Sequence, residues 1–325
     1  MLKKLTFFIL TAAALAWASG LPEVYEPRPE PKPKPEPPGV EKKPRVEKPS
    51  GREPGAELYD VRVVLAVGGV AETDIAAATA TLLPILERRA SQLARRHTLE
   101  RGPGEGRITV ELFDCPDPAR ALEILTAPGL LELQAVAERD IFVETLAAAG
   151  WPADQLLPYQ HGNVILVAAS DREDVAGALR AALEPGERVL WTRKLEVREG
   201  DVYKAALATG DGMAVTSAVD AAVVTGAGGE PDVHFDLSER DGTIFSGLTA
   251  RHIGEALAVV FDDELFYTAR VKEQTFKSGR IIGERDEARA ADIALLLSSG
   301  SLPATLTPLE YYVDGESRPI PQPSK

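Results

Sequence analysis

Apolar residues recur at two spacings in residues 58–96, and each spacing predicts an element. Residues 58–67 alternate between apolar and polar, with Val61, Val63 and Leu65 on one side, which predicts a strand with one buried face. Residues 74–96 repeat apolar positions three and four apart, which predicts a helix with one apolar face. Pro84 inside this helix is expected to bend it.

The next residues predict a hairpin, a second helix and a further strand. Residues 97–101 and 107–113 flank a Gly-Pro-Gly-Glu-Gly segment, as in a hairpin. Residues 117–125 predict a helix that Pro116 and Asp117 open, and residues 130–136 predict a strand. The order β-α-β-β-α-β is that of the split ferredoxin-like unit, so we expect residues 57–138 to form an α+β base domain of this type.

Residues 139–202 show a strand-helix-strand pattern that indicates no particular fold. Residues 163–169 and 188–197 predict strands, and residues 171–183 predict the helix between them. We treat this stretch as an unassigned α/β piece.

Residues 203–325 contain the most regular pattern of the chain. Residues 231–237 alternate so that Val233, Phe235 and Leu237 are expected to be buried. Residues 249–303 predict helix, strand, turn, two strands and helix in that order. The apolar run 257–261 has the length of a buried strand and ends at Asp262-Asp263, which we interpret as a hairpin tip.

The last helix of this stretch has recognisable ends. Asp286 is expected to cap its N-terminus and Gly300 its C-terminus. Residues 306–312 then predict a final strand that returns to the fold.

The stretch 249–303 resembles the periplasmic head region of SecD, a membrane subunit of the bacterial Sec protein-export machinery. That family carries a threonine, an (Asn)-Ile-Gly, a run like Leu-Ala-Ile-Val-Leu-Asp-Gly, an Ile-x-Gly and a closing Gly-x-Leu-Pro. The matching residues are Thr249, Ile253, Gly254, Leu257, Ala258, Val260, Asp262, Ile281, Gly283, Ala288, Leu296, Gly300, Leu302 and Pro303. The sequence departs from the pattern at His252, Asp263 and Arg270, where the family favours Asn, Gly and Pro.

Residues 57–138 are similar to the base part of the same SecD region in element order. The resemblance implies an α+β fold, in which a ferredoxin-like base is followed by a SecD-type α+β head at residues 203–325 with a C-terminal return strand. The residues to which it assigns a structural or binding role are Thr249, Ile253, Gly254, Asp262, Gly283, Gly300, Leu302 and Pro303.

The N-terminal 56 residues predict an export signal followed by a tether. Residues 1–20 combine Lys3-Lys4, an apolar run and Ala16-Trp17-Ala18, as in a secretory signal peptide, and an uncleaved anchor is the alternative. Residues 21–56 hold 11 of the 25 prolines of the chain, alternating with charged residues. An extended polyproline-II linker of this length spans about 100 Å at about 3.1 Å per residue. It is either a spacer for a domain or a solvated linker without a partner.

The charge, cysteine and histidine content argue against several classes of partner and site. The net charge is −14 and basic residues are not clustered, so we expect no nucleic-acid partner. Cys115 is the single cysteine, so no internal disulfide can form, and we expect it to be buried at a strand end. The histidines are far apart in sequence, without a ligand spacing typical of zinc: His97, His161, His234 and His252. We therefore predict no cofactor, no metal and no catalytic site.

The resemblance implies a binding function. In SecD, transmembrane helices that couple proton flow to export follow the periplasmic region, whereas no run of about 18 apolar residues occurs here after residue 21. We expect a non-enzymatic periplasmic or otherwise exported module, which contacts unfolded or translocating polypeptide or docks on an envelope or Sec-machinery protein. Membrane association is expected only through an uncleaved N-terminal segment. Two alternatives stay open, an enzyme with an unrecognised site in residues 140–202 and a purely structural envelope protein.

Overall fold

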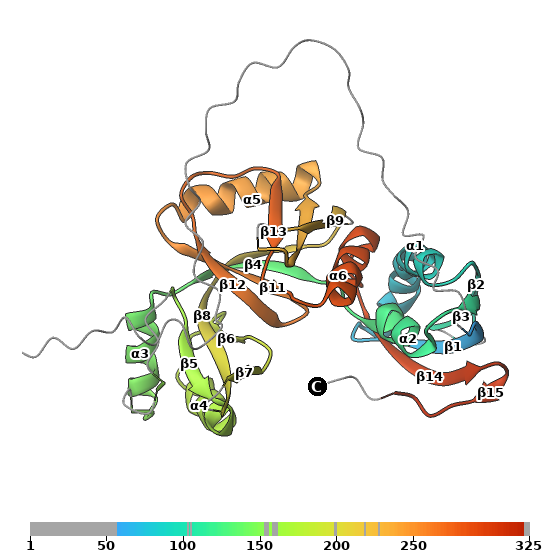
Figure 1. Cartoon of the computed structure of the whole chain (residues 1–325), viewed down its shortest axis with the longest axis horizontal. Helices are drawn as coiled ribbons and strands as arrows, with labels where there is room; N and C mark the ends of the chain where they lie inside the picture. The colour runs from blue at the N-terminus through green and yellow to red at the C-terminus, as the bar shows by residue number, and fades with distance from the viewer. Residues whose placement is uncertain are drawn as a thin grey trace, which may run out of the picture.

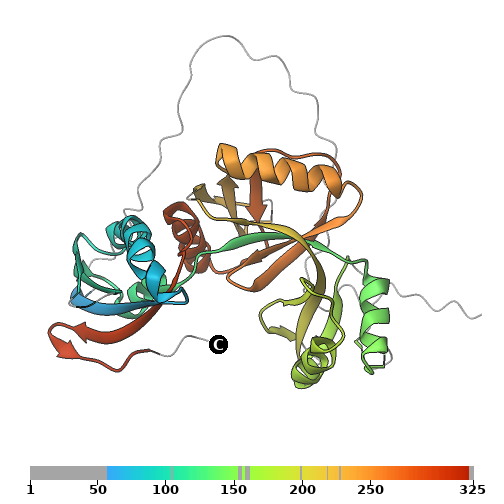
Figure 2. The same cartoon turned by 180° about the vertical axis from the view of Figure 1, so that it is seen from behind.

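The computed structural model describes residues 57–102, 104, 106–152, 156–157, 162–197, 200–217, 219–226 and 228–321. The predicted signal peptide and linker lie outside the described residues, as do His161 and two residues of the predicted glycine turn. The described residues form a base sheet with two helices, a central ring of strands, a head, and a side lobe within residues 139–202 (Figures 1 and 2).

The base sheet combines residues from both ends of the described chain, in the strand order β15-β14-β1-β3-β2. Its strands are β1 (Tyr59–Gly68), β2 (Arg96–Arg101), β3 (Arg107–Cys115), β14 (Thr305–Val313) and β15 (Glu316–Ser317). A 3-10 turn (Glu72–Asp74) leads into helix α1 (Ile75–Leu93), and helix α2 (Pro118–Thr126) packs against α1. These elements confirm the strand, helices and hairpin predicted from the sequence, and Cys115 is buried at the end of β3 as expected.

The strand predicted at residues 130–136 forms, as β4 (Leu131–Val136), but its predicted place in the base unit is wrong. It pairs with β11 (Ala256–Phe261) and β8 (Gly200–Val215) instead. The place beside β1 belongs to β14, the strand predicted at residues 306–312. Residues 57–138 alone therefore do not complete a β-α-β-β-α-β unit. Apolar alternation specifies which face of a strand is buried, but not which strand it pairs with.

Five strands close into a ring at the centre of the molecule. The pairings run β4-β11-β12-β6-β8 and return to β4, with β12 (Glu264–Arg270) and β6 (Arg188–Trp191) joined in parallel at one residue pair. Small side chains fill the interior, because a ring of few strands leaves little space inside. The buried residues of this cluster are Val136, Val164, Leu190, Ala206, Ala208, Ala256, Ala258, Val260 and Leu265.

The side lobe packs two helices on the outer half of β8. Helices α3 (Arg139–Ala148) and α4 (Arg172–Arg180) bury Phe142, Leu146, Val175 and Leu179 against β5 (Ile165–Ala168) and β8. Strand β7 (Leu195–Val197) also pairs with β8. The strand predicted at residues 163–169 and the helix predicted at residues 171–183 are thus confirmed, and the strand predicted at residues 188–197 forms as two strands, β6 and β7.

The head is a three-stranded antiparallel sheet of order β13-β10-β9, with two helices. Its elements are β9 (Asp220–Thr225), β10 (Pro231–Asp236), β13 (Ser278–Ile281), α5 (Glu239–Arg251) and α6 (Glu287–Ser299). Helix α6 covers the inner face of β9 and β10, where Val233 and Phe235 are buried as predicted. Asp286 accepts the N–H groups of Ala288 and Arg289 at the start of α6, and Gly300 ends it at φ 94°, so both predicted caps are confirmed.

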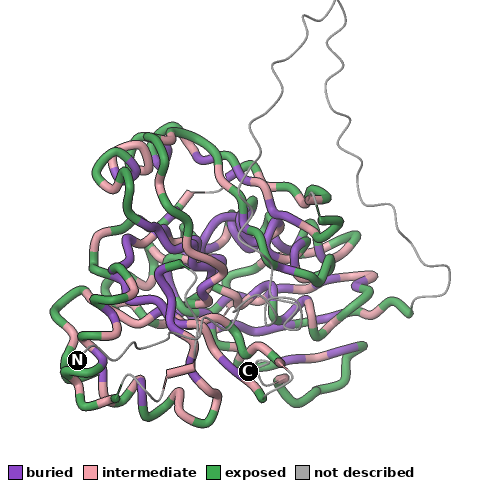
Figure 3. Tube along the Cα trace, turned by 60° about the vertical axis from the view of Figure 1, so that its left-hand side comes forward, coloured by how far each residue is buried: buried purple, intermediate pink, exposed green. Residues whose placement is uncertain are grey.

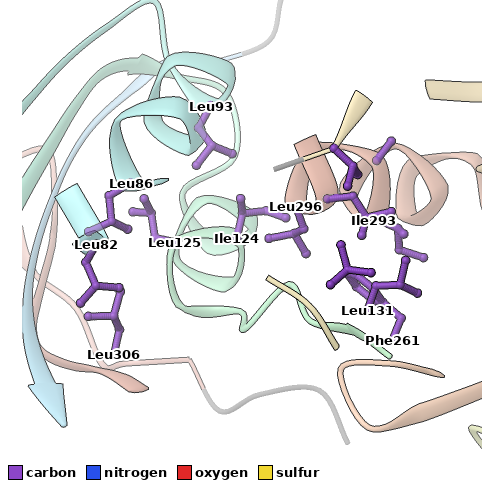
Figure 4. Packing of buried hydrophobic residues seen from close by; sticks show 14 of the residues in the cluster. Leu82, Leu86, Leu93, Ile124, Leu125, Leu131, Phe261, Ile293, Leu296 and Leu306 are labelled. Carbon is purple, nitrogen blue, oxygen red and sulfur yellow. The ribbon is translucent and has the colours of Figure 1, made fainter. Parts of the chain in front are cut away.

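Base and head share one continuous core. Leu82, Leu86 and Leu125 of α1 and α2 belong to the same buried cluster as Leu296 and Ile293 of α6 (Figure 4). The cluster continues to β4 and β11 through Leu131 and Phe261. Figure 3 shows buried positions along the strands of the interior and exposed positions at the outer turns and helix faces. Helix α6 is therefore packed on the base as well as on the head sheet.

Candidate functional site

The residues that the sequence resemblance singled out do not gather in one place. Asp262, Gly300 and Leu302 lie where the base meets the rest of the molecule. Thr249, Ile253 and Gly254 lie at the end of α5, on the far side of the head. Gly283 lies in the exposed connection between β13 and α6, with φ 91°.

Asp262 forms a tie between the β11–β12 turn and the segment that precedes β4. Asp262 and Asp263 have φ 48° and 65°, so the tip turns through two left-handed residues, which confirms the predicted hairpin tip. The Asp262 carboxylate accepts the N–H groups of Leu130 at 2.7 Å and Gly129 at 3.1 Å. Burial raises the pKa of this carboxyl, against the effect of the two N–H donors and the Arg89 charge. The geometry makes Asp262 a structural residue.

Arg89 lies at the same junction and was not among the residues predicted from the sequence. Its guanidinium is fully buried, and burial lowers its pKa to about 10. The side chain donates to oxygens at the ends of α2 and α6: Ile124 O, Ala127 O, Pro128 O, Ser299 Oγ and Gly300 O. Four of these acceptors are backbone carbonyls at or just beyond the C-terminal ends of the two helices, where carbonyls have no partner within the helix, and the fifth is the Ser299 hydroxyl. A sequence signal exists, because Arg89 falls between Leu86 and Leu93 on the apolar face of its helix.

Leu302 and Pro303 continue this junction. The Leu302 N–H donates to Pro128 O at 2.8 Å, which holds the segment between α6 and β14 against the end of α2. Together with Arg89 and Asp262, this contact fixes base, ring and head to one another.

Thr249 and Gly254 bind the segment that connects β12 to β13. The Thr249 hydroxyl accepts the Thr275 N–H at 3.0 Å and lies 3.1 Å from Thr275 O. The Gly254 N–H donates to Val271 O at 2.8 Å. Ile253 is 55% exposed between them. These contacts hold α5 on the head and leave Ile253 as an exposed apolar residue.

His252, where the SecD pattern favours Asn, belongs to an ionic cluster at the end of α5. Its Nε2 lies 2.8 Å from Asp211 Oδ2 on β8, and its Nδ1 lies 2.6 Å from Glu255 Oε2. Arg251 also donates to Asp211, at 3.0 Å. Burial lowers the pKa of His252, but the hydrogen bonds to Glu255 and Asp211 outweigh it and hold that pKa above its usual value. The cluster fixes α5 to the central ring.

A hollow of about 550 Å³ lies on the outer face of the head sheet, opposite α6. We call it the head hollow; it is lined by Asp220, Ala222, His234, Phe235, Asp236, Tyr267, Ser278, Gly279 and Arg280. Burial raises the pKa of Tyr267, at its side, to about 12. None of the eight residues singled out from the SecD pattern lines this hollow.

The strand register arranges the lining of the head hollow in rows. Asp220 on β9 is directly opposite Asp236 on β10, which is opposite Ser278 on β13. The next row holds Ala222, His234 and Arg280. Among the described residues, neither the Asp220 nor the Asp236 carboxylate has a hydrogen-bond or ion-pair partner, whereas Arg280 lies 3.7 Å from Asp232. Sequence analysis missed this site because it depends on the register of three strands, of which β13 is separated from β10 by α5, β11 and β12.

The β9 edge is the second feature of this site. We use this name for the backbone of Asp220–Thr225 on the side away from β10; within the described residues β9 pairs with β10 alone. Ala222 and Val224 are exposed on this strand, and no charged residue follows Asp220 within it. An unpaired strand edge of this kind offers N–H and C=O groups to an incoming extended chain.

No three His, Cys, Asp or Glu side chains among the described residues gather where they could hold a metal ion. The head hollow and a smaller hollow of about 250 Å³ on the base sheet are both lined by residues outside 139–202, the stretch proposed for an enzyme site. Within the described part of the chain, no helix is long and apolar enough to cross a membrane.

Comparison with known proteins finds a family model that matches the head. Residues 193–304 match the family described as SecDF, P1 head subdomain. The protein translocase subunit SecD of Koribacter versatilis is 28% identical over 218 residues, which are 67% of this chain and 35% of that protein. SecDF of Thermus thermophilus is 28% identical over 71% of this chain and 27% of that protein. The matched region thus spans about a third of these relatives.

Solved structures agree on the fold. A structure of SecDF, a membrane component that enhances protein export, covers 77% of this chain and 98% of its own, with a TM-score of 0.51 and 22% identity. A crystal structure of SecDF in its super-membrane-facing form covers 81% of this chain and 32% of its own, with a TM-score of 0.52 and 21% identity. The resemblance to the periplasmic region of SecD that the sequence predicts is confirmed.

Proposed function

We propose that this chain, whose residues 193–304 match the SecDF P1 head subdomain, is a non-enzymatic, exported module that binds unfolded or translocating polypeptide. The binding site in this proposal is the β9 edge. Export rests on the predicted signal peptide of residues 1–20, and an association with protein translocation rests on the names of the relatives.

The observation that carries the proposal is an open strand edge whose single charge is at its first residue, Asp220. Natural sheets block their edges with charged side chains, prolines or bulges, because an open edge recruits other strands. From Ala221 to Thr225 the β9 edge has none of the first two and is paired without a register shift to β10. An extended polypeptide can extend the sheet here through backbone hydrogen bonds, which is a binding mode that tolerates many sequences.

The base has a supporting role in this proposal. We propose that it is a ferredoxin-like unit whose fourth strand is β14 rather than β4, since the order β14-β1-β3-β2 is antiparallel throughout. The C-terminal strand then anchors the end of the head stretch to the base. In this arrangement β8 holds the N-terminal end of residues 203–304 and β14 holds the C-terminal end.

The test is fluorescence anisotropy with labelled, unfolded peptides and the full-length exported protein. Val224→Lys places a charge on the β9 edge, and we expect it to weaken peptide binding about tenfold, a change of about 1.4 kcal/mol in binding free energy. Leu309→Lys is the matched control, because Leu309 is 43% exposed on β14 and Val224 is 41% exposed on β9. We expect Leu309→Lys to bind peptide as the wild type does.

A second arm tests the backbone pairing itself. Peptides methylated at alternate backbone nitrogens keep their side chains but lose the donors on one edge of the strand. One methylation phase should abolish binding and the other should preserve it, because a strand pairs through one edge at a time. Wild-type protein that binds no unmethylated peptide, or binds both methylated forms equally, would contradict the proposed function.

A further inference from the structure

The outer face of the head sheet is acidic at the start of β9, at Asp220, and apolar near its end, at Val224. We infer that the β9 edge selects extended segments that carry an aliphatic residue and, four residues later, a lysine or arginine. This inference rests on the proposed function and specifies which segments the site binds.

The acidic end of the face lacks a cation. Asp220 and Asp236 are directly opposite one another on neighbouring strands, and like charges in this position destabilise a sheet. Among the described residues neither carboxylate is paired, and both are exposed. The nearest arginine of the lining, Arg280, lies by Asp232 in a different row. A basic side chain from a bound segment would relieve the repulsion.

The other end of β9 is apolar. Val224 lies four residues after Asp220, and alternation along a strand puts both side chains on one face. Val224 is 41% exposed. Asp232, which is opposite Val224 on β10, is 9% exposed and is paired with Arg280, so it adds little negative charge to this end.

These two ends define the pattern of the bound segment. A strand beside β9 would place one residue opposite Asp220 and another opposite Val224, about 13 Å apart for four residues at about 3.3 Å each. Every pairing within the head sheet is antiparallel, and we take the same direction for the added strand. The aliphatic residue is then N-terminal to the basic one. A lysine can reach both Asp220 and Asp236, because neighbouring strands are only about 4.8 Å apart.

The experiment compares three labelled peptides of otherwise identical composition with the full-length protein. The first peptide has valine and lysine four residues apart. The second has them three residues apart, which places the two side chains on opposite faces of the strand. The third is the first peptide with glutamate in place of lysine. We expect the first peptide to bind about tenfold more tightly than either of the others at low salt, and the difference to shrink as salt screens the charges.

Two variants assign the preference to the acidic pair. Asp220→Asn with Asp236→Asn keeps size and polarity, and should remove the preference for lysine over glutamate. Asp263→Asn is the matched control, because Asp263 is an exposed aspartate outside the head hollow and Asn tolerates its φ of 65°. It should leave the preference unchanged.

The outcomes separate this inference from the proposed function. Equal binding of all three peptides, or a preference that survives Asp220→Asn with Asp236→Asn, would overturn the inference and leave binding at the β9 edge intact. Absence of binding by any peptide would overturn the proposed function, and the inference with it.

Discussion

The two six-residue edge strands of this molecule, β2 in the base and β9 in the head, differ in how they meet solvent. β2 carries Arg96, Glu100 and Arg101, all exposed, whereas β9 carries a charge only at Asp220. A charged edge resists a further strand, because pairing would desolvate the charges. Charge therefore disfavours strand addition at β2, whereas no charged side chain opposes it after Asp220 in β9.

The other edge of the base supports the same contrast. On this side β15 pairs with the end of β14, β14 contains Pro308, which has no N–H to donate, and the register between β1 and β14 shifts between Val64 and Leu65. On the base surface, Glu111 accepts from Thr98 at 3.0 Å and lies 4.0 Å from Arg62. In the head hollow, Asp220 and Asp236 face each other instead. The base surface thus pairs its carboxylate with a hydroxyl and an arginine, whereas the head places two carboxylates opposite each other without a cation between them.

The substitution with the largest expected effect tests whether the base, with its β2 edge, and the head, with its β9 edge, unfold as one unit. Arg89→Met removes the donors to oxygens at the ends of both α2 and α6. We expect it to lower the free energy of unfolding by about 3–5 kcal/mol, since buried carbonyls lose their partners. Native-state hydrogen exchange should show lost protection in β3 and in β10 together, because their residues share one core cluster.

Arg88→Met is the control for this experiment. The Arg88 side chain donates to Ser299 O alone, so its loss should cost about 1 kcal/mol. Loss of protection in the base only, with β10 unaffected in Arg89→Met, would contradict the shared core.

The elements of both regions could be predicted from the sequence, because each depends on nearby residues. The alternation at Val233 and Phe235 and the caps at Asp286 and Gly300 are local signals, and the structure confirms them. The partner of β4 could not be predicted, since its pairing with β11 joins residues more than a hundred positions apart. The base was consequently predicted to end with β4 when its sheet is completed by β14.

The candidate site was harder to predict for the same reason. Asp220, Asp236 and Ser278 form one row only through the register of three strands, and no spacing in the sequence shows it. The SecD pattern drew attention to Asp262 and Thr249 instead, whose contacts hold elements together. Asp262 and Thr249 belong to a sequence motif because turns and helix ends need particular residues. An open strand edge needs no particular residue, so it leaves no motif in the sequence.

The prediction of intermediate size exchanges the charge properties of the β2 and β9 edges. Glu100→Thr with Arg101→Thr removes charges from the β2 edge, and Ala222→Lys adds one to the β9 edge. We expect each variant to change the free energy of unfolding by less than about 0.5 kcal/mol, since all three sites are exposed. The β2 variant should gain concentration-dependent self-association or peptide binding, and Ala222→Lys should lose peptide binding about tenfold.

Sedimentation velocity over a range of concentrations and peptide anisotropy measure these changes against the wild type. A β2 variant that behaves as the wild type in both assays would show that charge is not what closes the base edge. The contrast between the two edges would then need another physical cause.

The smallest effect concerns pH and should appear in the head rather than in the base. Protonated His252 is held between Asp211 of β8 and Glu255, with Arg251 on the same Asp211, and these hydrogen bonds keep the pKa of His252 above its ordinary value. A raised pKa in the folded state contributes stability that is complete below the unfolded pKa of about 6.5 and is lost as pH rises through the folded pKa. We expect the free energy of unfolding to fall by less than about 1 kcal/mol between pH 6 and pH 8, because the partners are largely exposed.

His252→Asn should abolish this decline and Glu255→Gln should reduce it, as denaturant titrations across this range can measure. Hydrogen exchange should place the loosening at α5 and β10, not at β2. A pH profile that is the same in wild type and His252→Asn would show that the cluster does not control the stability of the head.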